Sequence, residues 1–131
     1  MPTLELSVES NPQELIAFRR NELDFKIKFI LSNVDSNSAY WVETLVEVEP
    51  PISLAPDRPL KLGKINVGIL SNGAVKEKRF KIFSNNDIYP DTFQIKITTL
   101  MYDSDGAVAE RKEVKHDVVC TDKGGKNGKV L

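Results

Sequence analysis

Apolar and polar residues alternate along most of this chain with a period of two, in short segments that end at turn residues. The clearest segment is 23–31, where every second residue is leucine, isoleucine or phenylalanine and three of the four residues between them are charged. Because successive side chains of a β-strand point to opposite faces of a sheet, this pattern predicts a strand with one buried face. Helical spacing is almost absent, so the chain is expected to be all-β.

The alternation predicts about seven strands, with turn signals every ~8 to 12 residues, which is typical of two packed antiparallel sheets with Greek-key links. The expected fold is therefore an immunoglobulin-like antiparallel β-sandwich. One segment stays open, because residues 13–21 fit either a single helical turn or a further short strand. The strands are expected within residues 4–8, 23–31, 41–49, 65–69, 75–83, 93–101 and 108–120.

Two glycine-containing turns are expected to join neighbouring strands as hairpins. The first is Ser-Asn-Gly at 71–73, and it follows a strand whose alternation places Ile65, Val67 and Ile69 on one face. The second is Asp-Ser-Asp-Gly at 103–106, which leads into the last strand. In both turns the glycine supplies the positive φ angle that a tight turn requires.

The length of the chain, 131 residues, predicts one domain with its own core. We expect residues 1–121 to form this domain and residues 122–131, rich in glycine and lysine, to be a flexible tail. Four prolines between residues 50 and 59 predict an extended, irregular link. Four consecutive charged residues at 110–113 predict that the last strand lies at a sheet edge, protected against aggregation.

The charge balance argues against nucleic acid and membranes as partners. Eighteen basic and nineteen acidic residues give a net charge of −1, so no field of one sign attracts a polyanion. Basic residues do mix with Phe80 and Phe83 in the segment 76–83, as in single-strand binders. Alternation, however, sends Lys76 and Lys78 to the same side as Phe80, so no clean basic or stacking surface is expected.

The expected location is the cytoplasm. No apolar run approaches the roughly 20 residues of a spanning helix, and the N-terminus lacks the pattern of a signal peptide. Cys120 is the only cysteine, so no intramolecular disulfide can form, and no Asn-x-Ser/Thr acceptor occurs. A domain cut from a longer exported protein would show the same features, and its location would then be extracellular.

No enzyme and no cofactor are expected, because the residues for a catalytic group are missing. The chain has one histidine, His116, and in a regular strand it lies ~13 Å from Cys120, too far for the two to act together. His116 is therefore expected to be structural and Cys120 inert among valines. One cysteine and one histidine also leave no set of ligands for zinc.

The turn at 103–106 resembles the opening of a calcium loop. Ala107 and Val114 stand where an EF-hand needs further oxygen ligands, so a hairpin turn is the favoured interpretation. The alternative function for the chain is nevertheless a calcium- or carbohydrate-binding surface module. It would use loops at one end of the sandwich, those at Asp35, at Asp87 and at 103–105.

Trp41 and Leu45 carry the leading hypothesis. Alternation places them among glutamates, on the side of their strand opposite Val42 and Val46. Large apolar side chains on a charged sheet face often mark an interface, which predicts a non-enzymatic interaction or structural module with a protein partner or self-association, such as a homodimer. Two alternatives remain: the proline-rich link covers these side chains, or the register is reversed and Trp41 is the core tryptophan of an immunoglobulin-like domain.

Several segments together are similar to a known group of domains. They are the Trp-Val-Glu strand at 41–43, Leu62-Gly63 before the alternating strand, Tyr-Pro-Asp-Thr-Phe-Gln-Ile at 89–95, and the turn at 102–106. This set resembles the small immunoglobulin-like modules of prokaryotes, with the CARDB-like group nearest, over roughly residues 3–121. The resemblance implies the sandwich fold. Such modules usually act as spacers or binding units of surface proteins, which would imply export.

Overall fold

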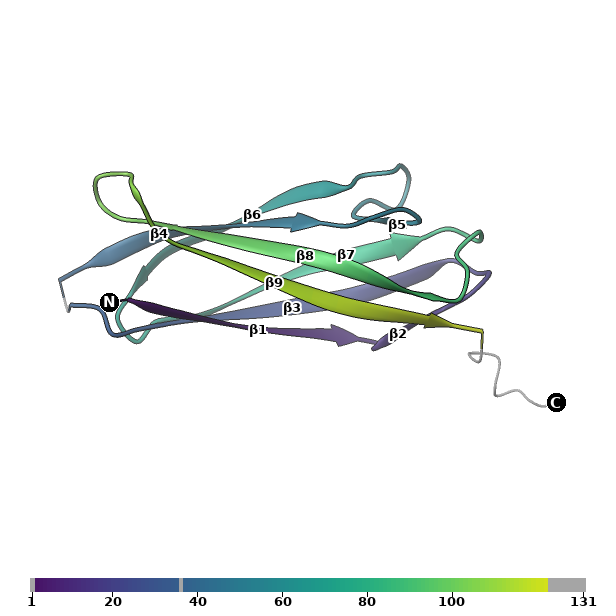
Figure 1. The fold of residues 1–131 in the computed structure, drawn as a ribbon, viewed down its shortest axis with the longest axis horizontal. Coiled ribbons are helices and arrows are strands. Elements are labelled where there is room, and N and C mark those ends of the chain that lie inside the picture. Colours follow the sequence, from purple (N-terminus) through teal and green to yellow (C-terminus); the bar gives the residue numbers. More distant parts are fainter. Residues whose placement is uncertain (1, 36, 123–131) are drawn as a thin grey trace.

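The computed structural model describes residues 2–35 and 37–122. These residues form nine β-strands and no helix, and hence no helix that could span a membrane. The strands make two stacked sheets, so the predicted all-β sandwich is confirmed (Figure 1). Of the predicted tail at 122–131, all but Asp122 lies outside the described residues.

One sheet, sheet A, has four strands in the order β1-β3-β7-β5, and the other, sheet B, has five in the order β2-β9-β8-β4-β6. Neighbouring strands are antiparallel except β2 and β9, which are parallel. Sheet A contains β1 (Thr3–Asn11), β3 (Asn21–Ser32), β5 (Ile52–Ser53) and β7 (Val75–Ser84). Sheet B contains β2 (Glu14–Ile16), β4 (Ala39–Glu47), β6 (Leu62–Ser71), β8 (Asp91–Tyr102) and β9 (Val108–Thr121).

Nine strands, rather than about seven, result from two short additional ones, β2 and β5. β2 lies within residues 13–21, so this segment contains a short strand and not a helical turn. Asn21 closes the turn that follows it, because its side chain accepts from the Ile16 N–H at 2.9 Å and donates to the Ile16 carbonyl at 2.8 Å. β5 lies inside the proline-rich link, which is therefore not irregular throughout.

The core lies between the inner faces of the two sheets. β3 runs between β1 and β7, and its alternate residues Leu23 to Leu31 are fully buried, as its pattern predicts. The rings of Phe25 and Phe80 stack at a centroid distance of 5.0 Å. From sheet B, Val42 and Val46 of β4 point into the same core, and so do alternate residues of β8.

β6 departs from its predicted alternation. Val67 is buried at 2% exposure, but Ile69 is 64% exposed and Leu70 takes the buried position instead. The cause is a β-bulge: the register shifts between Val42 and Glu43, and Gly68 adopts a φ of +105°. The prediction that Val67 and Ile69 share a face is therefore wrong, because one extra residue reverses the faces of all that follow.

The turn at 71–73 is tight, as predicted, but it does not join a hairpin. The Ala74 N–H donates to the Ser71 carbonyl at 2.9 Å and Gly73 has a φ of +78°, yet β6 and β7 belong to different sheets. Leu31 of β3 exchanges main-chain hydrogen bonds with Gly73 and Ala74, at 2.8 and 3.1 Å, and so directs β7 into sheet A. The second turn does join a hairpin, between β8 and β9.

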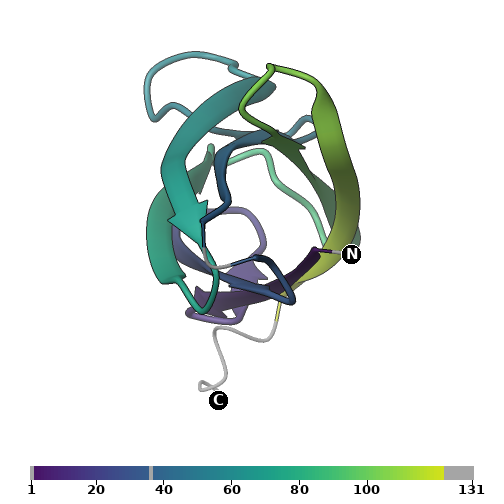
Figure 2. The same cartoon turned by 90° about the vertical axis from the view of Figure 1, so that its left-hand side faces the viewer.

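Two lysines connect the edges of the two sheets. β9 pairs with β2 only at residues 119–121, so most of its length is an edge, including the charged residues 110–113. From β9, Lys112 Nζ donates to the Leu4 carbonyl of β1 at 2.8 Å. On the other side, Lys76 Nζ of β7 donates to the Val67 carbonyl of β6 at 3.3 Å. Figure 2 shows the sandwich end-on, with β6 and β7 on one side and β9 and β1 on the other.

Candidate functional site

A row of apolar side chains crosses the outer face of sheet B near one end. Ile69, Trp41, Tyr102 and Val108 stand directly opposite one another on β6, β4, β8 and β9. Ile69 is 64% exposed, Trp41 40% and Val108 55%, while Tyr102 is half-buried. These four residues are called the apolar row below. Side chains directly opposite on neighbouring antiparallel strands are in contact range, so the row forms one continuous surface.

Trp41 lies on the outer face, where the alternation places it. The proline-rich link does not cover it, because that link pairs through β5 with the far end of β7 in sheet A. Leu45 lies on the same outer face and is half-buried, but Glu43 stands between it and the row. The structure therefore puts one of the two predicted residues in the row and the other beside it.

The indole of Trp41 is held in one orientation by Glu43. Its Nε1–H donates to Glu43 Oε2 at 2.9 Å, and Lys64 Nζ lies 3.4 Å from the same oxygen. The indole hydrogen bond, followed by the charge of Lys64, lowers the pKa of the Glu43 carboxyl below its ordinary value. An aromatic side chain that is already fixed loses little conformational entropy when a partner covers it.

The alternation alone missed the other members of the row. Ile69 reaches the outer face only because of the bulge at Gly68, and a glycine within a strand pattern is the available signal for a bulge. Val108 faces Tyr102 because of a second irregularity, between Met101 and Tyr102 in the pairing of β8 with β9. No sequence signal marks that one.

The loops proposed for calcium or sugar do not come together. The loops at Asp35 and Asp103 lie at the end of the sandwich that carries the apolar row, whereas Asp87 precedes β8 at the opposite end (Figure 1). The carboxylate of Asp103 accepts from the N–H groups of Asp105 and Ala107, at 2.9 and 3.0 Å, and so stabilises its own turn. Among residues 2–35 and 37–122 no three candidate ligands cluster in a way that could hold a metal ion.

The remaining candidates lie on the inner faces of the two sheets and are buried or half-buried. His116 packs edge-on against Phe25, with ring centroids 5.4 Å apart. Cys120 is 3% exposed, and burial raises the pKa of its thiol above the ordinary value, which keeps it protonated. Phe80 of the basic strand stacks on Phe25, so its ring is not available to a nucleic-acid base.

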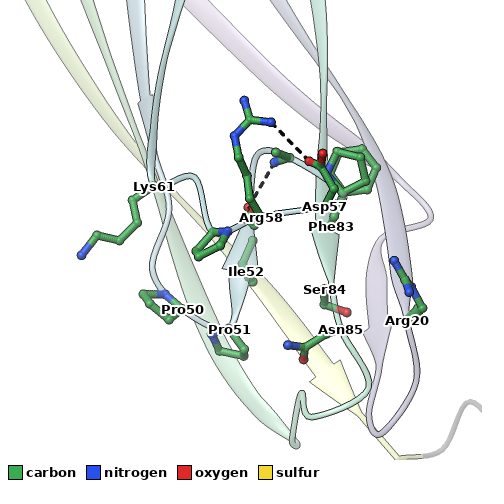
Figure 3. A pocket seen from close by; sticks show the side chains of 14 residues that line it. Arg20, Pro50, Pro51, Ile52, Asp57, Arg58, Lys61, Phe83, Ser84 and Asn85 are labelled. Carbon is green, nitrogen blue, oxygen red and sulfur yellow. Dashed lines mark hydrogen bonds and ion pairs between the residues drawn. The ribbon is translucent and has the colours of Figure 1, made fainter.

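A pocket of about 550 Å³ lies at the other end of the sandwich, between the link at residues 50–61 and the end of β7 (Figure 3). The four prolines of the link line it together with Phe83, Ser84 and Arg20, and Figure 3 shows Pro50 and Pro51 on the side opposite Arg20. The sequence predicted only a link here, because the side chains that form the pocket come from three separate segments.

No family model matches this chain, and no curated protein matches it. Among solved structures, one similar chain is a protein described as ApaA from Bordetella pertussis, with 11% identity, a TM-score of 0.46, and coverage of 92% of this chain and 94% of that one. Another is a β-glucosidase from Listeria innocua, with 14% identity, a TM-score of 0.37, and coverage of 99% of this chain and 17% of that one. At these values neither likeness indicates an activity.

Proposed function

We propose that this protein is a non-enzymatic interaction module that binds a protein partner, or a second copy of itself, through the apolar row on the outer face of sheet B. The observation that carries the proposal is the row itself. Three large apolar side chains of the row stand exposed on neighbouring strands, next to a half-buried tyrosine. Contiguous apolar surface of this kind is uncommon on a soluble domain that has no partner.

The residue types of the row support this function. Tryptophan and tyrosine are enriched at the centres of protein interfaces, where they contribute large contact areas. Trp41 and Tyr102 are neighbours at the middle of the row, with Ile69 and Val108 on either side. Charged side chains on the next rows, such as Glu43 and Arg111, supply the polar rim that interfaces usually have.

We also propose that the module has an immunoglobulin-like fold that resembles the CARDB-like group. Seven of the nine strands are nine residues or longer. If these seven long strands are lettered A to G in chain order, the first sheet contains strands A, B and E in that order. The second sheet contains strands G, F, C and D in that order. A constant-type immunoglobulin domain has A-B-E-D and C-F-G, so only the sheet of strand D differs. The single cysteine, which is buried, favours a reducing compartment such as the cytoplasm for this binding.

Site-specific photo-cross-linking tests the proposal. A photoreactive phenylalanine analogue is placed at Ile69, and as a matched control at Leu62, which is 54% exposed on the same strand but lies outside the row. Irradiation of the native host, followed by mass spectrometry, is expected to give one dominant adduct from position 69 and none from position 62. An adduct of twice the chain mass identifies a second copy.

Trp41→Ser provides the second arm. We expect it to abolish the adduct from position 69 while circular dichroism and melting temperature show an intact fold. Equal cross-linking from positions 69 and 62, together with a monomer at all concentrations in sedimentation, would show that the row is not an interface. Loss of folding in Trp41→Ser would instead assign Trp41 to stability.

A further inference from the structure

The pocket at the far end of the sandwich has a pre-formed wall. Ser53 of β5 organises it: its hydroxyl donates to the Arg58 carbonyl at 2.7 Å and accepts from the Leu60 N–H at 2.9 Å and the Ala55 N–H at 3.1 Å. The link also contains four prolines, whose φ angles are fixed by their rings. A wall with this much internal bonding needs little ordering when a ligand binds.

The surface of the pocket is a little more than half apolar. Ile52 is 3% exposed and belongs to the core, so it adds little surface, whereas Phe83 lies on the outer face of β7 and is half-buried. Prolines of the link stand opposite (Figure 3). The volume, about 550 Å³, is in the range of small-molecule sites, which typically combine an apolar lining with a few polar groups.

The charged groups of the pocket are mainly basic. Arg20 and Arg58 stand on opposite sides of Phe83, and Lys61 extends away from the others (Figure 3). Arg58 pairs with Asp57, the only acidic residue of the lining, at 3.3 Å, with both side chains more than 60% exposed. Among the described residues Arg20 has no ion pair. The lining thus contains two guanidinium groups and one carboxylate.

We propose that this pocket binds an organic anion, a carboxylate carried on an aromatic ring. The ring packs against Phe83 and the prolines, and the carboxylate replaces Asp57 as the partner of Arg58. Guanidinium groups bind carboxylates through charge-assisted hydrogen bonds, and Arg20 adds attraction from the other side. The same chemistry is offered by a free aromatic acid and by neighbouring phenylalanine and glutamate side chains of a peptide. This site is independent of the apolar row, which lies at the opposite end of the sandwich.

Amide chemical shifts of the 15N-labelled protein, titrated with benzoate, test the proposal. Benzamide serves as the neutral probe of the same shape, and N-acetyl-Phe-Glu-amide as the peptide source. We expect benzoate to shift the amide resonances of Ser53, Phe83 and Ser84, and benzamide to bind roughly tenfold more weakly because it lacks the charge. A stronger effect of the peptide than of benzoate identifies a peptide ligand, and the reverse identifies a small molecule.

Three charge variants and one control sharpen the test. Arg58→Gln and Arg20→Gln are each expected to weaken benzoate binding by about fivefold or more, since each removes a guanidinium partner. Asp57→Asn is expected to strengthen it about twofold, because Arg58 loses its competing carboxylate. Arg79→Gln removes an exposed arginine of β7 outside the pocket and is expected to change nothing.

Two results would overturn the proposal. One is the absence of shifts at the pocket with all three probes at 20 mM, a concentration on the order of ten times the Kd of weak millimolar binding. The other is equal affinity for benzoate and benzamide, unchanged by Arg20→Gln and Arg58→Gln, which would leave only an apolar cavity. Trp41→Ser leaves benzoate binding unchanged, so failure here is distinguishable from failure of the proposed interaction surface.

Discussion

The two outer faces of the sandwich have the same strand alternation but different chemistry. On sheet A, Lys26 lies between Glu9 and Glu77, at 3.8 and 3.5 Å, and Lys81 pairs with Glu22. Sheet B also has ion pairs, from Lys96 to Glu47 and Glu113 and from Lys64 to Glu43, but the row of residues at one of its ends is apolar. Outward side chains contribute little to the core, so the stability of the fold does not require the two outer faces to differ in chemistry. The difference between them therefore points to binding.

The largest expected effect compares Ile69→Lys with Val75→Lys. The two residues flank the same turn and are 64% and 56% exposed, but they lie on the outer faces of different sheets. Ile69→Lys should weaken association by about thirtyfold or more, roughly 2 kcal/mol, since it places a charge within the apolar row, directly beside Trp41. Val75→Lys should leave it unchanged. Sedimentation or partner titration measures both, and similar losses would remove the distinction between the faces.

Gly68→Ala should have the next largest effect. Gly68 has a φ of +105°, which side chains rarely allow, and an added Cβ would lie 3.0 Å from Lys76 Nζ. The substitution would therefore strain the bulge that turns Ile69 outward. We expect a loss of about 1 kcal/mol or more in the free energy of unfolding, measured with urea, and weaker association. Gly106→Ala, at a φ of +83° with open space around it, should lose stability but keep association. Full association in Gly68→Ala would show that the bulge does not orient Ile69.

A smaller effect is expected on acidification. The pKa of Glu43 is lowered, chiefly by the hydrogen bond from Trp41, so this bond is intact at neutral pH and is lost as the pH falls through the lowered value. Trp41 is the only tryptophan, so its fluorescence should report the change. Glu43→Gln should abolish this acid transition. An identical transition in that variant would assign it to another carboxyl.

The smallest effect is expected on sheet A. Lys26→Ala removes the ion pairs with Glu9 and Glu77, which are exposed and screened by salt. The free energy of unfolding should change by no more than about 0.5 kcal/mol, and association should not change. Urea denaturation at low and high salt measures this. A loss of association would mean that both outer faces take part in binding.

The sequence predicts best where a strand is regular and one of its faces is buried. β3 and β4 follow their alternation from end to end, so the placement of Trp41 outside and Val42 inside could be predicted. Period-two patterns fix the inner and outer faces as long as no residue is inserted. β6 breaks this condition at Gly68, so the alternation predicts the wrong face for Ile69.

Long-range features could not be predicted from local patterns. The Ser-Asn-Gly sequence predicts the turn at 71–73. Whether β6 and β7 then pair depends on the main-chain hydrogen bonds of Leu31, about forty residues earlier in the chain. The pocket depends on Ser53 bonding to Arg58 and Leu60, and on the approach of Arg20 from another segment. Neither arrangement has a sequence signature, because each is created by the fold.

Lys76 and Lys112 have a consequence for how copies of this chain can meet. Unprotected edge strands recruit further strands, and the result is linear polymerisation into fibrils. Here each ammonium engages a main-chain carbonyl on the facing edge strand, Val67 on one side and Leu4 on the other. An incoming strand would have to displace a cation at both flanks. These two cations therefore hinder the addition of a further strand at either edge of the sandwich.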